Sequence, residues 1–221
     1  MDIELHYTQR GSGEPLVLLH GNGEDSTYFE HQVGFLAKRF RVIAPDTRGH
    51  GKTPRGAAPF TLEQFACDLR EFLDGLDIGA AHLLGFSDGA NIAMLFALAH
   101  PDRVKSLVLN GGNLFPEGLE PDVRAEDARA FAEAQAAGDT RALELLRLMM
   151  DEPHIRPEQL AGIRVPTLVV AGTHDMILEE HTRLIAASIP GARLAFVEGD
   201  HFVAAGNPDV FNRALGTFYG F

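Results

Sequence analysis

The chain has 221 residues, of which 45% are hydrophobic and 23% are charged. These are the proportions of a globular protein, and a chain of this length can bury a sizeable core in one domain. Its formal net charge of −12 disfavours nucleic acid and anionic membranes as partners, because their phosphates would be repelled. The single cysteine, Cys67, allows no internal disulfide, and neither a secretory leader nor an apolar run of bilayer length is recognisable. We therefore expect a cytoplasmic protein that binds neither nucleic acid nor membranes.

Apolar segments of strand length alternate with longer segments of helical period. The strands are predicted at residues 3–8, 15–20, 40–44, 81–85, 104–109, 166–171 and 193–197. Thr61 begins a helix whose apolar residues recur every three or four positions, and residues 90–99 are apolar almost all round, as in a central helix. Asn207 and Pro208 begin a last helix. The alternation predicts an α/β fold: a mostly parallel sheet of seven or eight strands with helices on both faces.

Residues 113–162 interrupt this alternation, because they contain no convincing strand. Two helical patterns are present, near 121–137 and 139–150, and the segment holds eleven acidic and five basic residues. The second pattern places four apolar residues on one face, which must pack against something: Ala142, Leu145, Leu146 and Met149. We expect a small helical lid inserted into a single domain of residues 1–221.

The segment Gly85-Phe86-Ser87-Asp88-Gly89 lies between a predicted apolar strand and a predicted helix. This is the setting of a nucleophile elbow, a sharp turn that lifts a serine hydroxyl above the sheet. The turn leaves room only for small residues beside the serine, which accounts for both glycines. The following helix directs main-chain N–H groups and a partial positive charge toward the same point. Ser87 is therefore the predicted nucleophile.

A serine hydroxyl needs a base to take its proton and an acid to hold that base in the correct tautomer. In this kind of fold the three residues follow the chain order serine, acid, histidine. His201 follows the last predicted strand and is the predicted base, at the same sheet edge as Ser87. Asp175 follows the strand at 166–171 and is the predicted acid. Asp200 is the alternative, disfavoured because neighbours in sequence rarely point at each other's side chains.

The segment His20-Gly21-Asn22-Gly23 follows another predicted strand. Its glycines let the backbone curl, so the Asn22 N–H and, from the elbow, the Asp88 N–H can meet a developing oxyanion. Residues 21–26, with Asp46 about twenty residues on, also come close to a dinucleotide-binding fingerprint. That alternative has Ser26 in place of the third glycine and leaves the predicted triad unexplained, so we prefer the oxyanion hole.

The remaining histidines and the cysteine give no sign of further chemistry. No His-Glu-x-x-His spacing occurs, and Cys67 has no histidine at a spacing that would make it a nucleophile. The predicted site requires no metal ion and no cofactor.

Five segments, in order, resemble the signature segments of the α/β-hydrolase superfamily: His20-Gly21-Asn22-Gly23, residues 45–52, residues 85–89, residues 172–175 and Gly199-Asp200-His201. The resemblance covers nearly the whole chain. It implies an eight-stranded, mostly parallel sheet with an antiparallel second strand, of which the leading strand would be short or absent here. It also implies that Arg48 and His50 shape the loop behind the site without reacting.

The Ser-Asp-Gly elbow and the short insertion look like those of the valacyclovir-hydrolase-like branch of this superfamily. Members of that branch place an aspartate directly after the nucleophile, where it can recognise a substrate amine. Asp88 matches that position, whereas Ala90 departs from the glycine found there. The resemblance therefore makes Asp88 a candidate substrate-binding residue, and the acidic insertion would favour a cationic substrate.

Together these residues predict a serine hydrolase that cleaves a small carboxylic ester, an amide or a thioester through an acyl-Ser87 intermediate. Two alternatives use the same fold: a ligand-binding, receptor-like protein with slow turnover, and a carbon–carbon bond hydrolase or perhydrolase with the same triad. The partner is a small-molecule substrate in each case. The identity of that substrate depends on pocket shape, which one sequence does not reveal, and the oligomeric state is equally open.

Overall fold

A computed structural model of the protein describes residues 2–221. Its centre is a seven-stranded sheet with the spatial order β1-β3-β2-β4-β5-β6-β7. The strands are β1 (Tyr7–Arg10), β2 (Glu14–Leu19), β3 (Phe40–Pro45), β4 (Ala81–Phe86), β5 (Val104–Asn110), β6 (Thr167–Gly172) and β7 (Arg193–Val197). Only β1 is antiparallel to its neighbour, and all other pairs are parallel. The predicted α/β-hydrolase fold is confirmed, with β1 in the place of the antiparallel strand.

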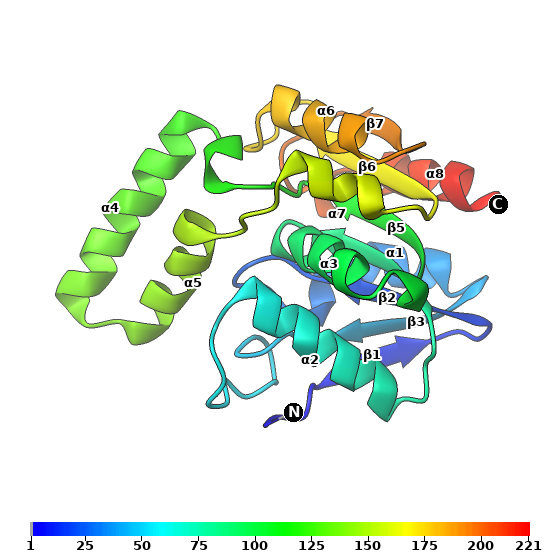
Figure 1. Cartoon of the computed structure of the whole chain (residues 1–221), viewed down its shortest axis with the longest axis horizontal. Helices are drawn as coiled ribbons and strands as arrows, with labels where there is room; N and C mark the ends of the chain where they lie inside the picture. The colour runs from blue at the N-terminus through cyan, green and yellow to red at the C-terminus, as the bar shows by residue number, and fades with distance from the viewer. Residues whose placement is uncertain (1) are drawn as a thin grey trace.

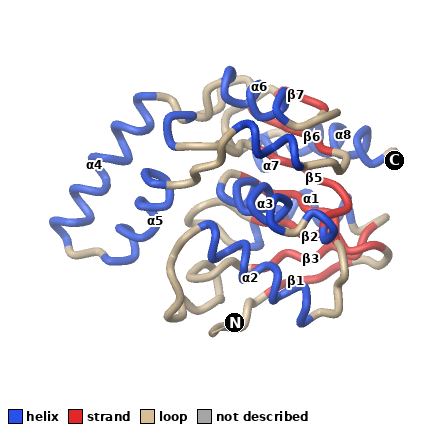
Figure 2. Tube along the Cα trace, in the orientation of Figure 1, coloured by secondary structure: helices blue, strands red, loops and turns tan. Residues whose placement is uncertain are grey.

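Helices cover both faces of the sheet (Figures 1 and 2). On one face lie α2 (Leu62–Gly75), α3 (Asp88–Ala99) and α6 (Glu179–Ser188). On the other lie the short turn η1 (Ser26–Phe29), α1 (Glu30–Leu36), α7 (Val203–Gly206) and α8 (Pro208–Tyr219). The inner strands bury apolar residues toward both faces, which explains their continuous hydrophobic runs. Within residues 2–221, no helix combines the length and the apolar content needed to cross a bilayer.

The bounds of the first strand were predicted wrongly. The first strand was predicted at residues 3–8 but begins at Tyr7, because Asp2 and His6 bond to the loop after β3 instead of to a neighbouring strand. Asp2 accepts from Arg48, and the His6 N–H donates to Thr53 Oγ1 at 2.9 Å. Asn207 and Pro208 begin the last helix as predicted, with Asn207 at the N-cap position, and the Asn207 side chain donates to the Glu198 carbonyl in the loop after β7.

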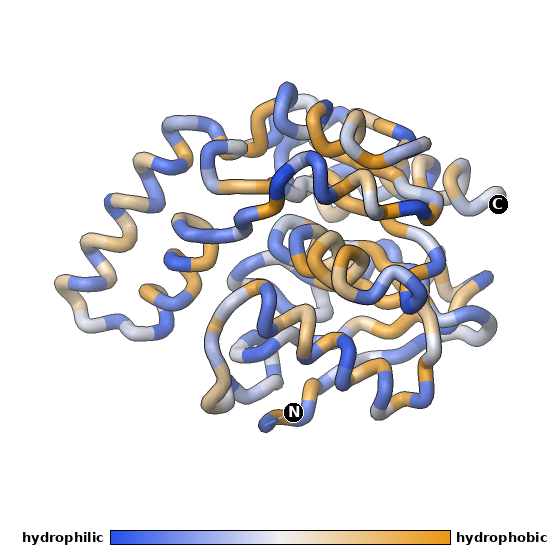
Figure 3. Tube along the Cα trace, in the orientation of Figure 1, coloured by the Kyte–Doolittle hydropathy of each residue, from blue (hydrophilic) through white to orange (hydrophobic). Residues whose placement is uncertain are grey.

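The insertion between β5 and β6 contains α4 (Pro121–Ala137) and α5 (Thr140–Asp151), close to the two predicted helices. The helices lie side by side beyond one end of the strands (Figure 1). The predicted apolar face of α5 is only half-buried, and the fully buried residue is Leu148 instead. The main neighbour of α5 is α4. Hydrophobic residues are more frequent on α5 than on α4 (Figure 3).

Candidate active site

Ser87 lies in the turn between β4 and α3, with a φ of 52° and a ψ of −120°. A non-glycine residue at positive φ is strained, so the surrounding structure must hold it there. Two glycines make the turn possible: a Cβ at Gly85 would overlap the Gly89 main chain, and a Cβ at Gly89 would overlap the Leu19 carbonyl. The Ser87 N–H donates to the Asn110 carbonyl at 2.8 Å. The elbow therefore fixes Ser87 at the carboxyl end of the central strands.

His201 lies in the loop after β7 and is only 4% exposed. Its Nδ1 is 2.6 Å from Oδ1 of Asp175. Its Nε2 is buried and has no hydrogen-bond partner within residues 2–221. Because a neutral imidazole donates from one nitrogen and accepts at the other, the contact with Asp175 leaves Nε2 as the acceptor. The ring packs against Phe86, the residue before Ser87, with ring centroids 4.8 Å apart.

Asp175 is fixed by more than its contact with the imidazole. Its carboxylate accepts the Gly172 N–H at 3.1 Å and the Ile177 N–H at 3.0 Å. Burial acts to raise the pKa of Asp175, but the contacts with His201 and the two N–H groups lower it below its ordinary value. Asp200, the alternative acid, accepts the N–H of Phe202 within its own turn. The geometry thus pairs His201 with Asp175 and not with Asp200.

A glycine after β5 makes room for this pair. Gly111 has a φ of +61°, and a Cβ there would lie 2.7 Å from Cε1 of His201 and 3.6 Å from the Asp175 carboxylate. Any larger residue would displace the imidazole. This explains why the segment after β5 is rich in glycine.

The loop after β2 is held by a buried histidine. His20 Nε2 accepts the Thr47 N–H at 3.0 Å, so its proton is on Nδ1, which donates to the Gly21 carbonyl at 2.8 Å. Burial lowers the pKa of His20 and so favours this neutral form. The C=O and N–H of a trans peptide point in opposite directions. The bond on the Gly21 carbonyl therefore aims the Asn22 N–H away from His20.

The N–H groups of Asn22 and Asp88 donate no hydrogen bond within residues 2–221. The loop and the elbow are in contact, because a Cβ at Gly89 would lie 2.7 Å from the His20 carbonyl oxygen. The Asn22 side chain acts to lower the pKa of the Asp88 carboxyl. The Asn22 amide also donates to the Leu145 carbonyl in α5 at 3.0 Å. Two unpartnered N–H groups beside a serine have the character of an oxyanion hole.

The Asp88 side chain is buried, and its Oδ2 has no hydrogen-bond partner within the described residues. Burial raises the pKa of Asp88 to about 6. The Asn22 amide acts to lower this pKa, and the Glu152 carboxylate acts to raise it. The carboxyl is consequently ionised at neutral pH. A buried negative charge of this kind favours a cationic group in its surroundings.

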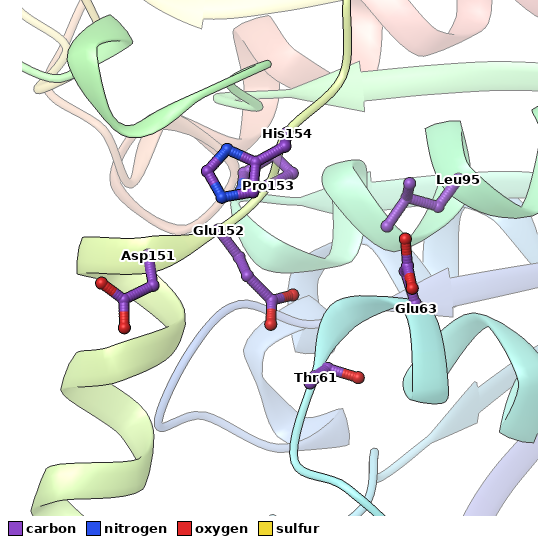
Figure 4. Close-up of a pocket in the computed structure, with 7 residues that line it drawn as sticks. All are labelled: Thr61, Glu63, Leu95, Asp151, Glu152, Pro153 and His154. Atoms are coloured by element: carbon purple, nitrogen blue, oxygen red, sulfur yellow. The ribbon is translucent and has the colours of Figure 1, made fainter.

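A cavity of about 350 Å³ lies between the start of α2, the middle of α3 and the chain that follows α5 (Figure 4). Three carboxylates line it, from Glu63, Asp151 and Glu152, together with the imidazole of His154. Glu152 points toward the start of α2, where it accepts the Leu62 N–H at 2.7 Å. Neither Ser87 nor Asp88 lines this cavity.

The loop between β3 and α2 is built from buried polar groups. Asp46 accepts the Ser26 N–H at 2.8 Å and the Lys52 N–H at 2.9 Å, so its carboxylate holds loops together instead of facing a ribose. Arg48 and His50 are each 1% exposed. This arrangement speaks against the dinucleotide-binding alternative. Within residues 2–221, no three His, Cys, Asp or Glu side chains are grouped so that they could hold a metal ion.

Two acidic residues near the site were missed by the sequence analysis, Glu24 and Glu152. Glu24 Oε2 accepts the Gly21 N–H at 3.1 Å. No motif marks either residue, and their proximity to the site depends on contacts between distant segments. The position of Glu24 inside the glycine loop was the only signal available.

Comparison with known proteins supports the same fold and class. A family model described as the alpha/beta hydrolase fold matches residues 14–148. A protein of Azorhizobium caulinodans, provisionally assigned as the carbamate hydrolase RutD, is 32% identical over 99% of this chain and 96% of its own. A 2-hydroxymuconate semialdehyde hydrolase of Pseudomonas sp. strain CF600 is 33% identical over 89% of this chain and 66% of its own. The solved enol-lactonase of Burkholderia xenovorans LB400 has a TM-score of 0.84 at 27% identity, covering 99% of this chain and 97% of that one.

A mostly parallel sheet with a strained serine at the strand–helix elbow is the architecture of α/β hydrolases. The chain belongs to the α/β-hydrolase fold family, and its relatives support hydrolase as the class of enzyme. The branch within that family stays a prediction.

Proposed function

We propose that the protein is a serine hydrolase that cleaves a small carboxylic ester through an acyl-Ser87 intermediate. The observation that carries the proposal is the state of His201: its Nδ1 is bound by Asp175 at 2.6 Å, while its Nε2 is buried beside the elbow without a partner. An imidazole prepared in this way accepts a proton from a serine hydroxyl. An amide or a thioester would react by the same steps.

In the first half-reaction, Ser87 Oγ attacks the carbonyl carbon and His201 Nε2 takes the hydroxyl proton. The Asn22 and Asp88 N–H groups hold the oxyanion, each contributing about 3 kcal/mol by precedent in other hydrolases. His201 then gives its proton to the leaving alcohol. In the second half-reaction a water molecule attacks the acyl group, with His201 again as base, and Asp175 stabilises the imidazolium in both halves.

The test is the substitution Ser87→Ala. We expect turnover of p-nitrophenyl acetate to fall by at least about 10⁴-fold and labelling by a fluorophosphonate to disappear, because no nucleophile remains. Ser12→Ala, at an exposed serine, is the matched control and should keep both. Unfolding temperatures of the two variants should match that of the unmodified protein. Retained turnover in Ser87→Ala would refute the acyl-serine mechanism.

Asp88 is our candidate for binding the substrate. A buried carboxylate beside the nucleophile would suit a substrate that carries an amine. Esters of amino acids and the matching neutral acyl esters differ in this group alone. We expect the higher kcat/KM for the amino-acyl member of each pair, and equal values would argue against the assignment.

The relatives supply one specific alternative. A semialdehyde hydrolase at 33% identity makes carbon–carbon bond cleavage with the same triad a second candidate, and a perhydrolase would share that triad too. Adding a vinylogous 1,5-diketone to the ester panel separates them, since an ester hydrolase would leave it intact. Tight ligand binding with negligible turnover of every member would instead favour a receptor-like role. The proposed cytoplasmic location rests on the exposed, unpaired Cys67.

A further inference from the structure

Glu24 has a half-buried carboxylate that the mechanism above does not use. It lies in the loop after β2, two residues beyond Asn22, and its side chain turns back onto that loop. Oε2 accepts the Gly21 N–H at 3.1 Å, and the Glu24 N–H approaches the Gly21 carbonyl at 3.4 Å. One residue thus contacts both main-chain polar groups of Gly21, the residue that precedes the predicted oxyanion donor.

One aromatic ring, that of Phe86, lies between Glu24 and the predicted base, His201. A Cβ at Gly21 would lie 3.0 Å from Glu24 Oε2 and equally close to the Phe86 ring, so the carboxylate and that ring flank the same glycine. The His201 ring packs against the same Phe86 ring, with the two ring centroids 4.8 Å apart.

We propose that Glu24 is a positioning residue for the hydrolytic reaction: its carboxylate holds the Gly21 N–H and so fixes the backbone at Gly21, whose carbonyl belongs to the peptide that presents the Asn22 N–H. The proposal rests on the serine mechanism proposed above. His20 holds the Gly21 carbonyl and Glu24 holds the Gly21 N–H, so the two side chains together define the direction of the Asn22 N–H. A loop fixed before substrate arrives needs no reorganisation when the oxyanion forms.

Protonation of Glu24 should therefore affect the rate within the working pH range. Burial raises the pKa of Glu24 to about 7, opposed by the Gly21 N–H and by His201. The other ionisable groups that face it are Asp25 on the same loop, which raises its pKa further, and the Tyr28 hydroxyl from η1. The carboxyl is charged above neutrality and loses its charge as the pH falls.

The experiment measures the rate at which a fluorophosphonate labels Ser87, which requires the nucleophile, the base and the oxyanion hole but no knowledge of the natural substrate. Glu24→Ala removes both the hydrogen bond and the charge, and we expect labelling at pH 8 at least about tenfold slower. Glu24→Gln keeps an acceptor for the Gly21 N–H, and we expect labelling at pH 8 within about threefold of the unmodified protein. Glu30→Ala, at an exposed glutamate on α1, is the matched control and should label normally.

The pH profile separates this role from a merely structural one. The labelling rate of the unmodified protein should change near pH 7, where Glu24 titrates, and Glu24→Gln should lack that change. Normal labelling of Glu24→Ala, or the same change near pH 7 in Glu24→Gln, would overturn the proposal while leaving the serine mechanism in place. Failure to label the unmodified protein would overturn both.

Discussion

The sheet edge that carries Ser87 and the insertion formed by α4 and α5 are held in very different ways. At the sheet edge, Ser87 is locked by glycine contacts, and Asp175 accepts two N–H groups besides the imidazole. In the insertion few side chains are buried. Its polar contacts with the loops of the sheet domain include the Arg55–Glu144 ion pair and the hydrogen bond from the Asn22 amide to the Leu145 carbonyl. The predicted reacting groups thus lie on the part with many buried contacts, whereas the insertion is more weakly held.

The largest effect should come from the rigid part. Asp175→Asn should lower kcat for p-nitrophenyl acetate by about 10³- to 10⁴-fold, because an amide no longer holds the imidazole in the tautomer that leaves Nε2 free. Asp200→Asn is the matched control, since Asp200 only accepts the Phe202 N–H, and it should stay close to the unmodified rate. A comparable loss in both variants would mean that the two aspartates share the role.

The next effect is on stability and concerns the loop behind the site. The fully buried guanidinium of Arg48 makes two bonds to Asp68, at 2.7 and 2.8 Å. Asp68→Ala should lower the free energy of unfolding by about 3 to 5 kcal/mol, because it leaves a buried charge short of its main partner. Urea unfolding followed by circular dichroism measures this in a chain without tryptophan.

Asp74→Ala provides the comparison for that measurement. Asp74 pairs with Arg103 at 2.8 Å, but its side chain is 50% exposed, so the loss should be small. Equal losses in the two variants would contradict the view that burial of Arg48 makes its pairing important.

The same contrast decides what the sequence predicts. The elbow, the base and the acid follow from local rules, because strand, turn and helix signals place Ser87, Asp175 and His201 at one sheet edge. Glu152 contacts a segment that is distant from it in the sequence, and the contact of Glu24 depends on how its loop folds back. Local periodicity predicts neither kind of contact. The prediction of which side of α5 is buried was wrong for the same reason. The sequence pattern indicates an apolar face but not how much of that face a neighbouring element covers.

Asp88, in the elbow, should show a conflict between stability and substrate binding. Its pKa is raised by burial to about 6 from an ordinary value of 3.8, so the charged form is the less stable one in the folded state. The destabilisation appears as the pH rises above about 4 and is complete above about 6. Asp88→Asn should therefore stabilise the fold by about 3 kcal/mol at pH 8, and by about half of that at pH 5.

The measurement is urea unfolding of both proteins at the two pH values, together with the paired ester panel. Asp88→Asn should lose the preference for amino-acyl esters while keeping turnover of neutral ones, because the oxyanion donor is the main chain of residue 88. A gain in stability that does not change with pH would show that the effect comes from packing and not from the charge.

The smallest effect should come from the insertion. Glu144 forms a bidentate ion pair with Arg55, but both side chains are more than a third exposed, Glu144 at 36% and Arg55 at 35%. Glu144→Gln should lower the free energy of unfolding by less than about 1 kcal/mol, and high salt should shrink the difference further, because water and ions screen exposed pairs. Hydrogen exchange should nevertheless quicken in α5 and stay unchanged in β4 and β5. With α5 less firmly tied, KM should change for bulky esters more than for the acetate. A loss of stability as large as that of Asp68→Ala would mean that α5 unfolds together with the sheet, and the insertion could then not move independently of the sheet domain.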